Sequence, residues 1–283
     1  MVFLAALSMF TSQYVPVWME ENEASHMAVA YSQFAALKQA VDMQVLAGAI
    51  QGTANVQMFS PVKLGAEGIP MFAAPTPGYL TISRSNSYDN VSFSFNTSSF
   101  GFNTSAPIEN YTSNTGGTIE LSVGNRYYIA QELAYENDAL ILKQSDGQYM
   151  KATPQFTVTG PPGGPYQISY AQLDLRGDDV NFIGFGTRGV KTLMKSTTTT
   201  TFTNLTSAPG ISGTPHLLFL NHTTYYERAW YSIFNQTLSS AGLKNGENYT
   251  PTMIRIGCTG TKNIMILLST PIHSMPRKAL KQS

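Results

Sequence analysis

The sequence predicts an α+β protein, mostly β, in which a long N-terminal helix precedes a β-sandwich-like head of one or two subdomains. Residues 17–46 contain no glycine or proline, so nothing local ends a helix there. Beyond about residue 50, short runs of alternating apolar and polar residues are separated by turn-forming glycine, asparagine and serine. We therefore assign 1–50 to a helix and 51–283 to a β-rich head, with a possible subdivision at the GPPGGP segment near 160–165.

The helix is predicted to run from about Val15 to Leu46. Its larger apolar residues, among them Met27, Tyr31 and Phe34, recur every three to four positions and so share one stripe. Pro16 is expected to kink or interrupt the helix, because proline removes one backbone hydrogen bond. Gly48 is the expected stop.

The leading segment is nearly all apolar but short. A membrane-spanning helix needs about 20 such residues, and the run from Met1 to Phe10 is followed by Thr11, Ser12 and Gln13. It also lacks the basic start of a secretory signal. We expect this segment to be buried against other copies of the chain or in a membrane. The predicted assembly residues are Met1, Val2, Phe3, Leu4, Leu7, Phe10, Tyr14, Val15, Val17, Trp18, Met27, Tyr31 and Phe34.

The composition suits an exported protein. Net charge is zero and only 12% of residues are charged, so there is no electrostatic footprint for nucleic acid. The single cysteine, Cys258, excludes an internal disulfide. Eight N-x-S/T sequons are candidates for N-glycosylation, although composition bias is an alternative explanation. They begin at Asn90, Asn96, Asn103, Asn110, Asn204, Asn221, Asn235 and Asn248. Asn235 is the weakest because it falls in a predicted helix, Tyr225–Ala241.

Motifs for catalysis are missing. The four histidines are scattered, and no nucleophile elbow, P-loop or dinucleotide-binding pattern occurs. We therefore expect no cofactor, no metal and no enzymatic activity. Asp174, Asp178 and Asp179 form the one acidic cluster of the head; a calcium site is conceivable, and a charged turn paired with Arg176 is the simpler interpretation.

Alternation and turn signals predict the strands of the head, with 96–117 as a long surface loop. The predicted strands are Met58–Leu64, Tyr79–Ser83, Val91–Phe95, Ile119–Val123, Tyr127–Tyr135, Ala139–Lys143, Phe156–Thr159, Tyr166–Leu175, Val180–Phe185, Val190–Met194, Leu217–Leu220, Met253–Cys258 and Asn263–Ser269.

Four segments carry a family resemblance: YVPVWMEENEASHM, FAALKQAVDMQVLAG, SPVKLGAEGIPMF and PGYLTI. Over roughly residues 13–82 the chain resembles archaeal type IV pilin-like surface proteins, which have an N-terminal hydrophobic helix and a β-rich ectodomain. The resemblance implies a precursor with a short basic leader that a prepilin-type peptidase removes. It also implies a helix that sits in the membrane before assembly and in the filament core afterward. The sequence departs from the family in its missing leader, its short apolar run and Pro16.

Three functions follow as hypotheses. The first is a structural subunit of an extracellular, cell-surface filament, whose partners are copies of itself, with other pilins or cell surfaces as further candidates. The second is a membrane-anchored surface glycoprotein or sugar-binding adhesin that does not polymerise. The third is a secreted enzyme on a β scaffold, for which the three aspartates above are the candidate acids. A role in a virus or envelope is a residual alternative.

Overall fold

The computed structural model has a long N-terminal helix followed by antiparallel β-sheets, which confirms the predicted fold class. It describes residues 2–51, 57–84, 90–95, 112–160, 167–196, 218–247, 249–255 and 262–268. The chain divides into two compact units, each built from separated stretches. Unit 1 comprises Met1–Arg84, Thr118–Ala152 and Arg176–Thr197, and unit 2 comprises Ser85–Gly117, Thr153–Leu175 and Thr198–Ser283.

The N-terminal helix α1 is longer at both ends than expected. It runs without interruption over Val2–Gln51, 50 residues, with Pro16 inside it and Gly48 passed. The expected interruption at Pro16 was wrong: a proline removes one hydrogen bond, and the glycine-free sequence on both sides sustains the helix. At 1.5 Å per residue α1 is about 75 Å long.

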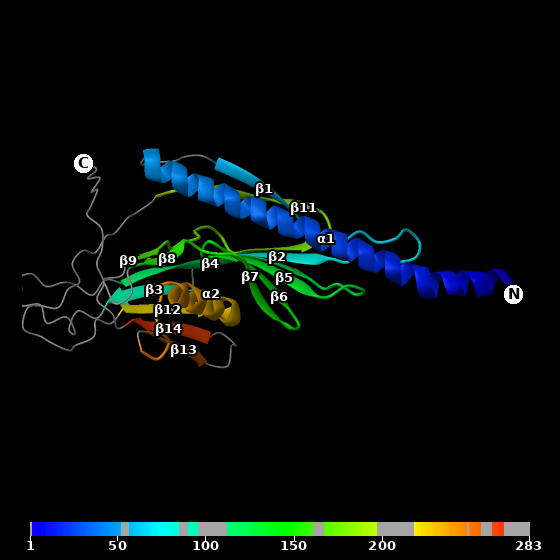
Figure 1. Ribbon diagram of the computed structural model, residues 1–283. Coiled ribbons are helices and arrows are strands. Elements are labelled where there is room, and N and C mark those ends of the chain that lie inside the picture. Colours follow the sequence, from blue (N-terminus) through cyan, green and yellow to red (C-terminus); the bar gives the residue numbers. More distant parts are fainter. Residues whose placement is uncertain are drawn as a thin grey trace, which may run out of the picture. The chain divides into compact units, whose positions relative to one another are not determined.

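Unit 1 packs two groups of strands against α1, and β1 and β11 run alongside the helix in Figure 1. Its strands are β1 (Gln57–Lys63), β2 (Gly78–Arg84), the second half of β4 (Thr112–Val123), β5 (Gln131–Glu136), β6 (Ala139–Gln144), β7 (Gly147–Ala152), β10 (Val180–Gly184) and β11 (Thr187–Leu193). β1 pairs with β11, and the remaining strands follow the order β10-β2-β4-β5-β6-β7. All the registered pairs are antiparallel, and the core lies between α1, β1, β5 and β6.

Unit 2 carries a second antiparallel sheet and the short helix. Its elements are β3 (Asn90–Phe95), the first half of β4, β8 (Phe156–Thr159), β9 (Gln167–Tyr170), β12 (Leu218–Thr224), α2 (Glu227–Ser240), β13 (Tyr249–Arg255) and β14 (Lys262–Leu268). The strand order is β13-β14-β12-β3-β4, and β8 and β9 form a separate pair. Trp230 and Phe234 of α2 are buried, and Phe234 meets Phe156 edge-on at 5.2 Å between ring centroids.

Strand predictions about the head failed in several places, and the strand expected over Tyr166–Leu175 forms only over Gln167–Tyr170. The loop expected over 96–117 is a strand from Thr112 onward, because β3 supplies a partner for residues rich in β-branched threonine. The strand expected to begin at Tyr127 begins at Gln131 instead. β7 was not foreseen, since its sequence GQYMKA contains little apolar alternation. Residues 161–165 of the GPPGGP segment and Cys258 lie outside the described residues.

Candidate assembly surface

One face of α1 belongs to the core of unit 1. Its buried residues recur every three or four positions, which brings them to a single face of the helix. They are Val15, Met19, Glu23, His26, Met27, Ala30, Phe34, Leu37, Val41 and Gln44. Three of them are polar, and each is met by a partner from the strands or loops of unit 1. The helix is therefore fixed to the head through more than apolar packing.

The most completely satisfied of these polar groups is the carboxylate of Glu23. Oε1 accepts hydrogen bonds from the Thr76 hydroxyl at 2.7 Å and the Arg126 amide at 3.1 Å. Oε2 accepts from the amides of Tyr127 and Tyr128, both at 2.8 Å. Glu23 has no exposed surface. Residues 126–128 turn their amides to this carboxylate, which explains why β5 begins only at Gln131.

These bonds set the protonation state of Glu23. Burial raises the pKa of the carboxyl, and the bonds from Thr76 and from the three amides lower it. The net pKa lies below its ordinary value of 4.5, so the residue is ionised at neutral pH. An ionised acceptor strengthens each bond. Glu23 thus ties α1 to the β4–β5 connection and to the loop before β2.

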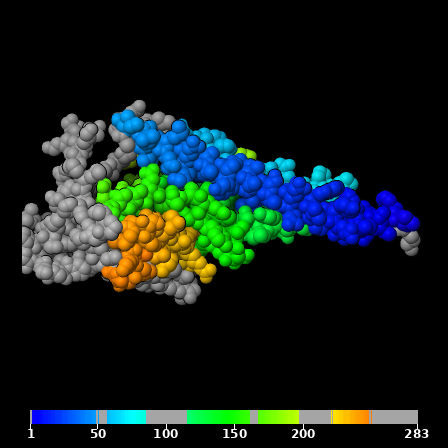
Figure 2. All heavy atoms as spheres, viewed as in Figure 1, coloured from blue at the N-terminus to red at the C-terminus, as the bar shows by residue number. Residues whose placement is uncertain are grey.

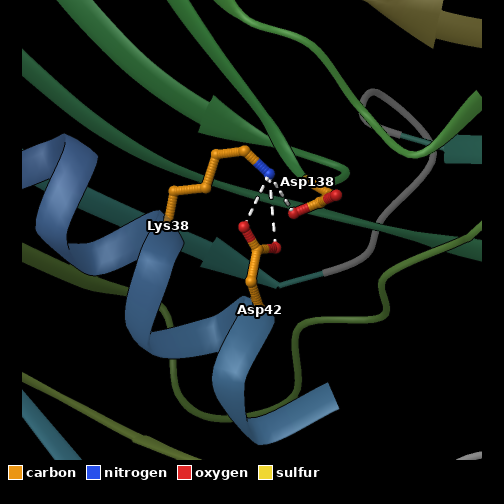
Figure 3. Close-up of polar contacts among 3 residues, drawn as sticks. All are labelled: Lys38, Asp42 and Asp138. Carbon is orange, nitrogen blue, oxygen red and sulfur yellow. Dashed lines mark hydrogen bonds and ion pairs between the residues drawn. The ribbon is translucent and has the colours of Figure 1, made fainter. Parts of the chain in front are cut away.

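A second clamp lies some four helical turns further along α1 (Figure 3). The Lys38 ammonium donates to Asp138 at 2.7 Å and lies 3.2 Å from a carboxylate oxygen of Asp42 on the next turn. Asp138 occupies the β5–β6 turn with φ 66°, after Asn137 with φ 43°. Both φ values match the tight two-residue hairpin turns for which Asn and Asp are suited. The clamp therefore joins α1 to a rigid turn.

Asp138 is the most perturbed acid of this clamp. Burial is the largest influence on its pKa and raises it, the bond from Lys38 lowers it, and Asp42 raises it again. The result is a pKa of about 6, against an ordinary value of 3.8.

Further side chains hold the helix between and beyond the clamps. Nε2 of His26 lies 3.1 Å from the Lys63 carbonyl, and the Lys63 amide donates to Oε1 of Gln33 at 2.8 Å. Gln44 donates to the Thr192 carbonyl at 3.0 Å. The tethers engage β1 and β11, the two strands that flank α1 in Figure 1. Side-chain contacts therefore attach α1 to the strands of unit 1 from Glu23 to Gln44.

Residues 2–18 of α1 differ from the clamped part of the helix, because most of them are exposed and none is charged. Figure 2 shows this end of the helix standing clear of the strands of unit 1. Exposed fractions reach 86% at Val2 and 75% at Phe3. By length and composition α1 can cross a membrane: the described chain has this one helix that qualifies, over Val2–Gly48. The short apolar run expected from the sequence gains this length because the helix continues through Pro16.

The predicted assembly residues separate into two groups. Those exposed in the single chain are Val2, Phe3, Leu4, Leu7, Tyr14, Val17, Trp18 and Tyr31. Val15, Met27 and Phe34 are buried against unit 1, and Phe10 is half-buried under Phe72. Tyr31, which spacing placed on the same stripe as Met27 and Phe34, faces outward. Met1 lies outside the described residues.

The outward face of α1 carries a second pattern that sequence reasoning missed. Exposed residues at spacings of three or four run almost the whole length of the helix, and we call them the outer stripe. It consists of Leu4, Leu7, Thr11, Tyr14, Trp18, Asn22, Ser25, Val29, Ser32, Ala36, Gln39, Met43, Leu46 and Ile50. None of these residues is charged. A mean spacing of 3.5 is the repeat of helices that pack along each other, so the outer stripe is suited to a helical partner.

None of the charges on α1 belongs to the outer stripe, but Glu21 borders it, three residues after Trp18 and four before Ser25. The helix has five charged side chains, of which Glu23, Lys38 and Asp42 are engaged within unit 1. Only Glu20 and Glu21 are charged and exposed. A helix that faced water along this side would normally carry charged residues there. The spacing of these uncharged residues is present in the sequence. It could be recognised as a surface only once the structure showed which face of α1 is buried.

Among the sequons, Asn235 alone has a described side chain. It lies on α2, as predicted, and its Oδ1 accepts a hydrogen bond from the Tyr249 hydroxyl at 2.6 Å. Asn90 and Asn221 lie on β3 and β12, with only the backbone described. Asn96, Asn103, Asn110, Asn204 and Asn248 lie outside the described residues.

The acidic cluster is not assembled around one centre. Asp179 accepts from the Arg84 amide at 2.9 Å and lies 3.6 Å from the Arg84 side chain, at the end of β2. Across the described ranges, no group of three or more His, Cys, Asp or Glu residues is arranged to hold a metal ion.

A scan against protein-family models and searches of curated proteins and of solved structures found no match.

Proposed function

We propose that the protein is a structural, non-catalytic subunit of an extracellular archaeal type IV pilus-like filament. Copies polymerise through α1, which is held in the membrane before assembly, and they display a glycosylated β-rich head. The observation that carries the proposal is the outer stripe: exposed, uncharged residues at spacings of three and four, bordered by the charge of Glu21, on a helix whose buried face is clamped to its own head. The resemblance described above supports the same proposal.

The clamps at Glu23 and Lys38 support assembly because they hold the helix in a fixed orientation on the strands of unit 1. A head hinged loosely on its helix would not transmit the order of a helical core to the surface of a filament. Glu23 and Lys38 instead fix the strands of unit 1 about the helix axis, so each packed helix places these strands in one position. Burial of apolar surface at about 25 cal/mol per Å² supplies the driving force for packing. Head-to-tail contacts that do not close into a ring generate a helical lattice.

Electron microscopy of wild-type and variant material tests the proposal. Met43→Lys and Leu46→Lys place charge on the outer stripe at residues that are 54% and 61% exposed, so the single chain tolerates both. Ile183→Lys on β10, at a residue 65% exposed, is the matched control. We expect filaments from wild type and control, and folded but unassembled protein from the double-lysine variant. Filaments of normal yield from that variant, or soluble wild-type monomers, would contradict the proposal.

The membrane-anchored adhesin is the second candidate, because a helix able to cross a membrane serves an anchor equally well. It predicts wild-type protein that remains dispersed in the membrane and binds glycans or cell surfaces. The same images separate the two.

A further inference from the structure

We propose that the loop Ile69–Ala73 of unit 1 is a second membrane contact, which enters the lipid surface beside α1. This rests on the membrane-held stage of the proposed function. The loop precedes β2, and its tip carries the most exposed large apolar side chain among those described, Met71 at 100%. Phe72 beside it is 43% exposed.

The loop is built to hold its tip out. The amides of Phe72 and Ala73 both donate to the Ile69 carbonyl, at 3.0 and 2.9 Å. Met71 is held at φ 70°, a backbone conformation that favours glycine and that a methionine adopts only when its surroundings impose it. At Gly68 a Cβ would collide with the backbone of Ala73. The loop is therefore narrow and firmly shaped.

Its base is fixed to α1. Ala66 and Thr76 exchange two backbone hydrogen bonds at 3.0 Å, and the Thr76 hydroxyl donates to Glu23. At the tip, Phe72 meets Phe10 of α1 edge-on at 5.4 Å between ring centroids. Phe10 in turn contacts Tyr14 at 5.7 Å and Trp18 at 5.4 Å. The tip thus extends an aromatic cluster on the exposed part of the helix.

The position of the loop along α1 indicates that its partner is lipid. Phe10 lies ten residues, about 15 Å of helix, before Glu20, the first charge of α1. A bilayer that covers the uncharged segment up to Trp18 therefore reaches Phe72 as well. The loop is compatible with this position, because no charged residue occurs from Gly68 to Ser83. Tyr and Trp are enriched where membrane meets water, which suits Tyr14 and Trp18.

A protein partner fits the tip less well. A protruding methionine needs a shaped apolar recess, whereas lipid accepts it without one. The recess described on the helix side of unit 1 is lined by polar groups, including His26, Lys63 and Glu67. We therefore commit to lipid, and contact with a second copy becomes an outcome of the test.

The test places a fluorescent label at single cysteines of the full chain, in a Cys258→Ser background. Met71→Cys reports the tip and disturbs no packing, Leu4→Cys reports the helix, and Glu67→Cys is the matched control at the loop base, where the side chain is 79% exposed. The labelled chains are placed in phosphatidylcholine vesicles with nitroxide groups on the acyl chains. We expect a blue shift and loss of fluorescence at positions 4 and 71, and quenching by aqueous iodide at position 67.

Each other result overturns the inference in a recognisable way. Quenching by lipid at position 4 with iodide access at position 71 rejects the loop contact and leaves the membrane stage intact. Iodide access at both positions rejects the membrane stage and the loop contact together. Protection of position 71 in filaments but not in vesicles assigns the tip to a neighbouring copy instead of lipid.

Discussion

Replacing Glu23 by glutamine tests whether the helix is clamped to the head by charge. In the most favourable orientation the new amide group takes the place of Oε1 and donates to the Thr76 hydroxyl. The Arg126 amide, which donates to Oε1 at 3.1 Å, then loses its acceptor. The bonds from Tyr127 and Tyr128 remain but lose the charge of the acceptor.

The cost follows from those losses. An orphaned buried amide costs about 1–3 kcal/mol, and each hydrogen bond to a charged group is stronger than a neutral one by about 1 kcal/mol. We therefore expect Glu23→Gln to lower the free energy of unfolding by about 3–5 kcal/mol, and Glu23→Ala by more. Glu20→Gln and Glu21→Gln remove the same charge from exposed positions and should each change it by less than about 0.5 kcal/mol.

The assay is urea unfolding of the detergent-solubilised chain, followed by near-ultraviolet circular dichroism. Because the pKa of Glu23 is lower in the folded state, its stabilisation is present above the ordinary pKa of 4.5 and disappears as pH falls through the folded pKa. The Gln variant should lose that acid dependence. A Glu23→Gln variant as stable as the Glu20 and Glu21 controls would refute the clamp.

Other perturbations follow from the same structure. The folded-state pKa of Asp138, about 6, lies above its ordinary value of 3.8, so the folded chain binds the extra proton and its stability should fall as pH rises between these values, by up to about 3 kcal/mol. Asp138→Asn should flatten that slope in urea unfolding, and an unchanged slope would contradict the assignment. Gly78→Ala forces a Cβ into a neighbouring backbone carbonyl, whereas Gly124→Ala meets nothing within 4 Å; thermal unfolding should show a loss of about 2 kcal/mol or more for the first and little change for the second. Peptide mapping by mass spectrometry should find Asn235 unmodified, since its side-chain oxygen accepts a hydrogen bond from Tyr249 and the residue lies within α2; a glycan there would refute this.

In the head, alternation of apolar and polar residues predicted where strands occur better than it predicted where they begin and end. Val91–Phe95 and Phe156–Thr159 alternate apolar and polar residues, and both are strands with nearly the expected bounds. The residues from Thr112 to Gly117 do not alternate, and they form a strand because β3 lies beside them. Tyr127 and Tyr128 have high strand propensity, yet their amides serve Glu23. In these cases a partner distant in sequence outweighed the local preference.

By itself the sequence determined that a long apolar helix precedes a β-rich chain, because glycine-free length and two-residue alternation are local properties of the chain. The tertiary structure alone decided which side of that helix the head covers. In the sequence, Glu23, Lys38 and Gln44 look like ordinary polar residues of a helix. Their partners, at positions 76, 126–128, 138 and 192, are distant in sequence and are brought to them only by the fold. Once that inner face is occupied, the outer stripe is the largely uncharged surface that α1 can still offer to a partner.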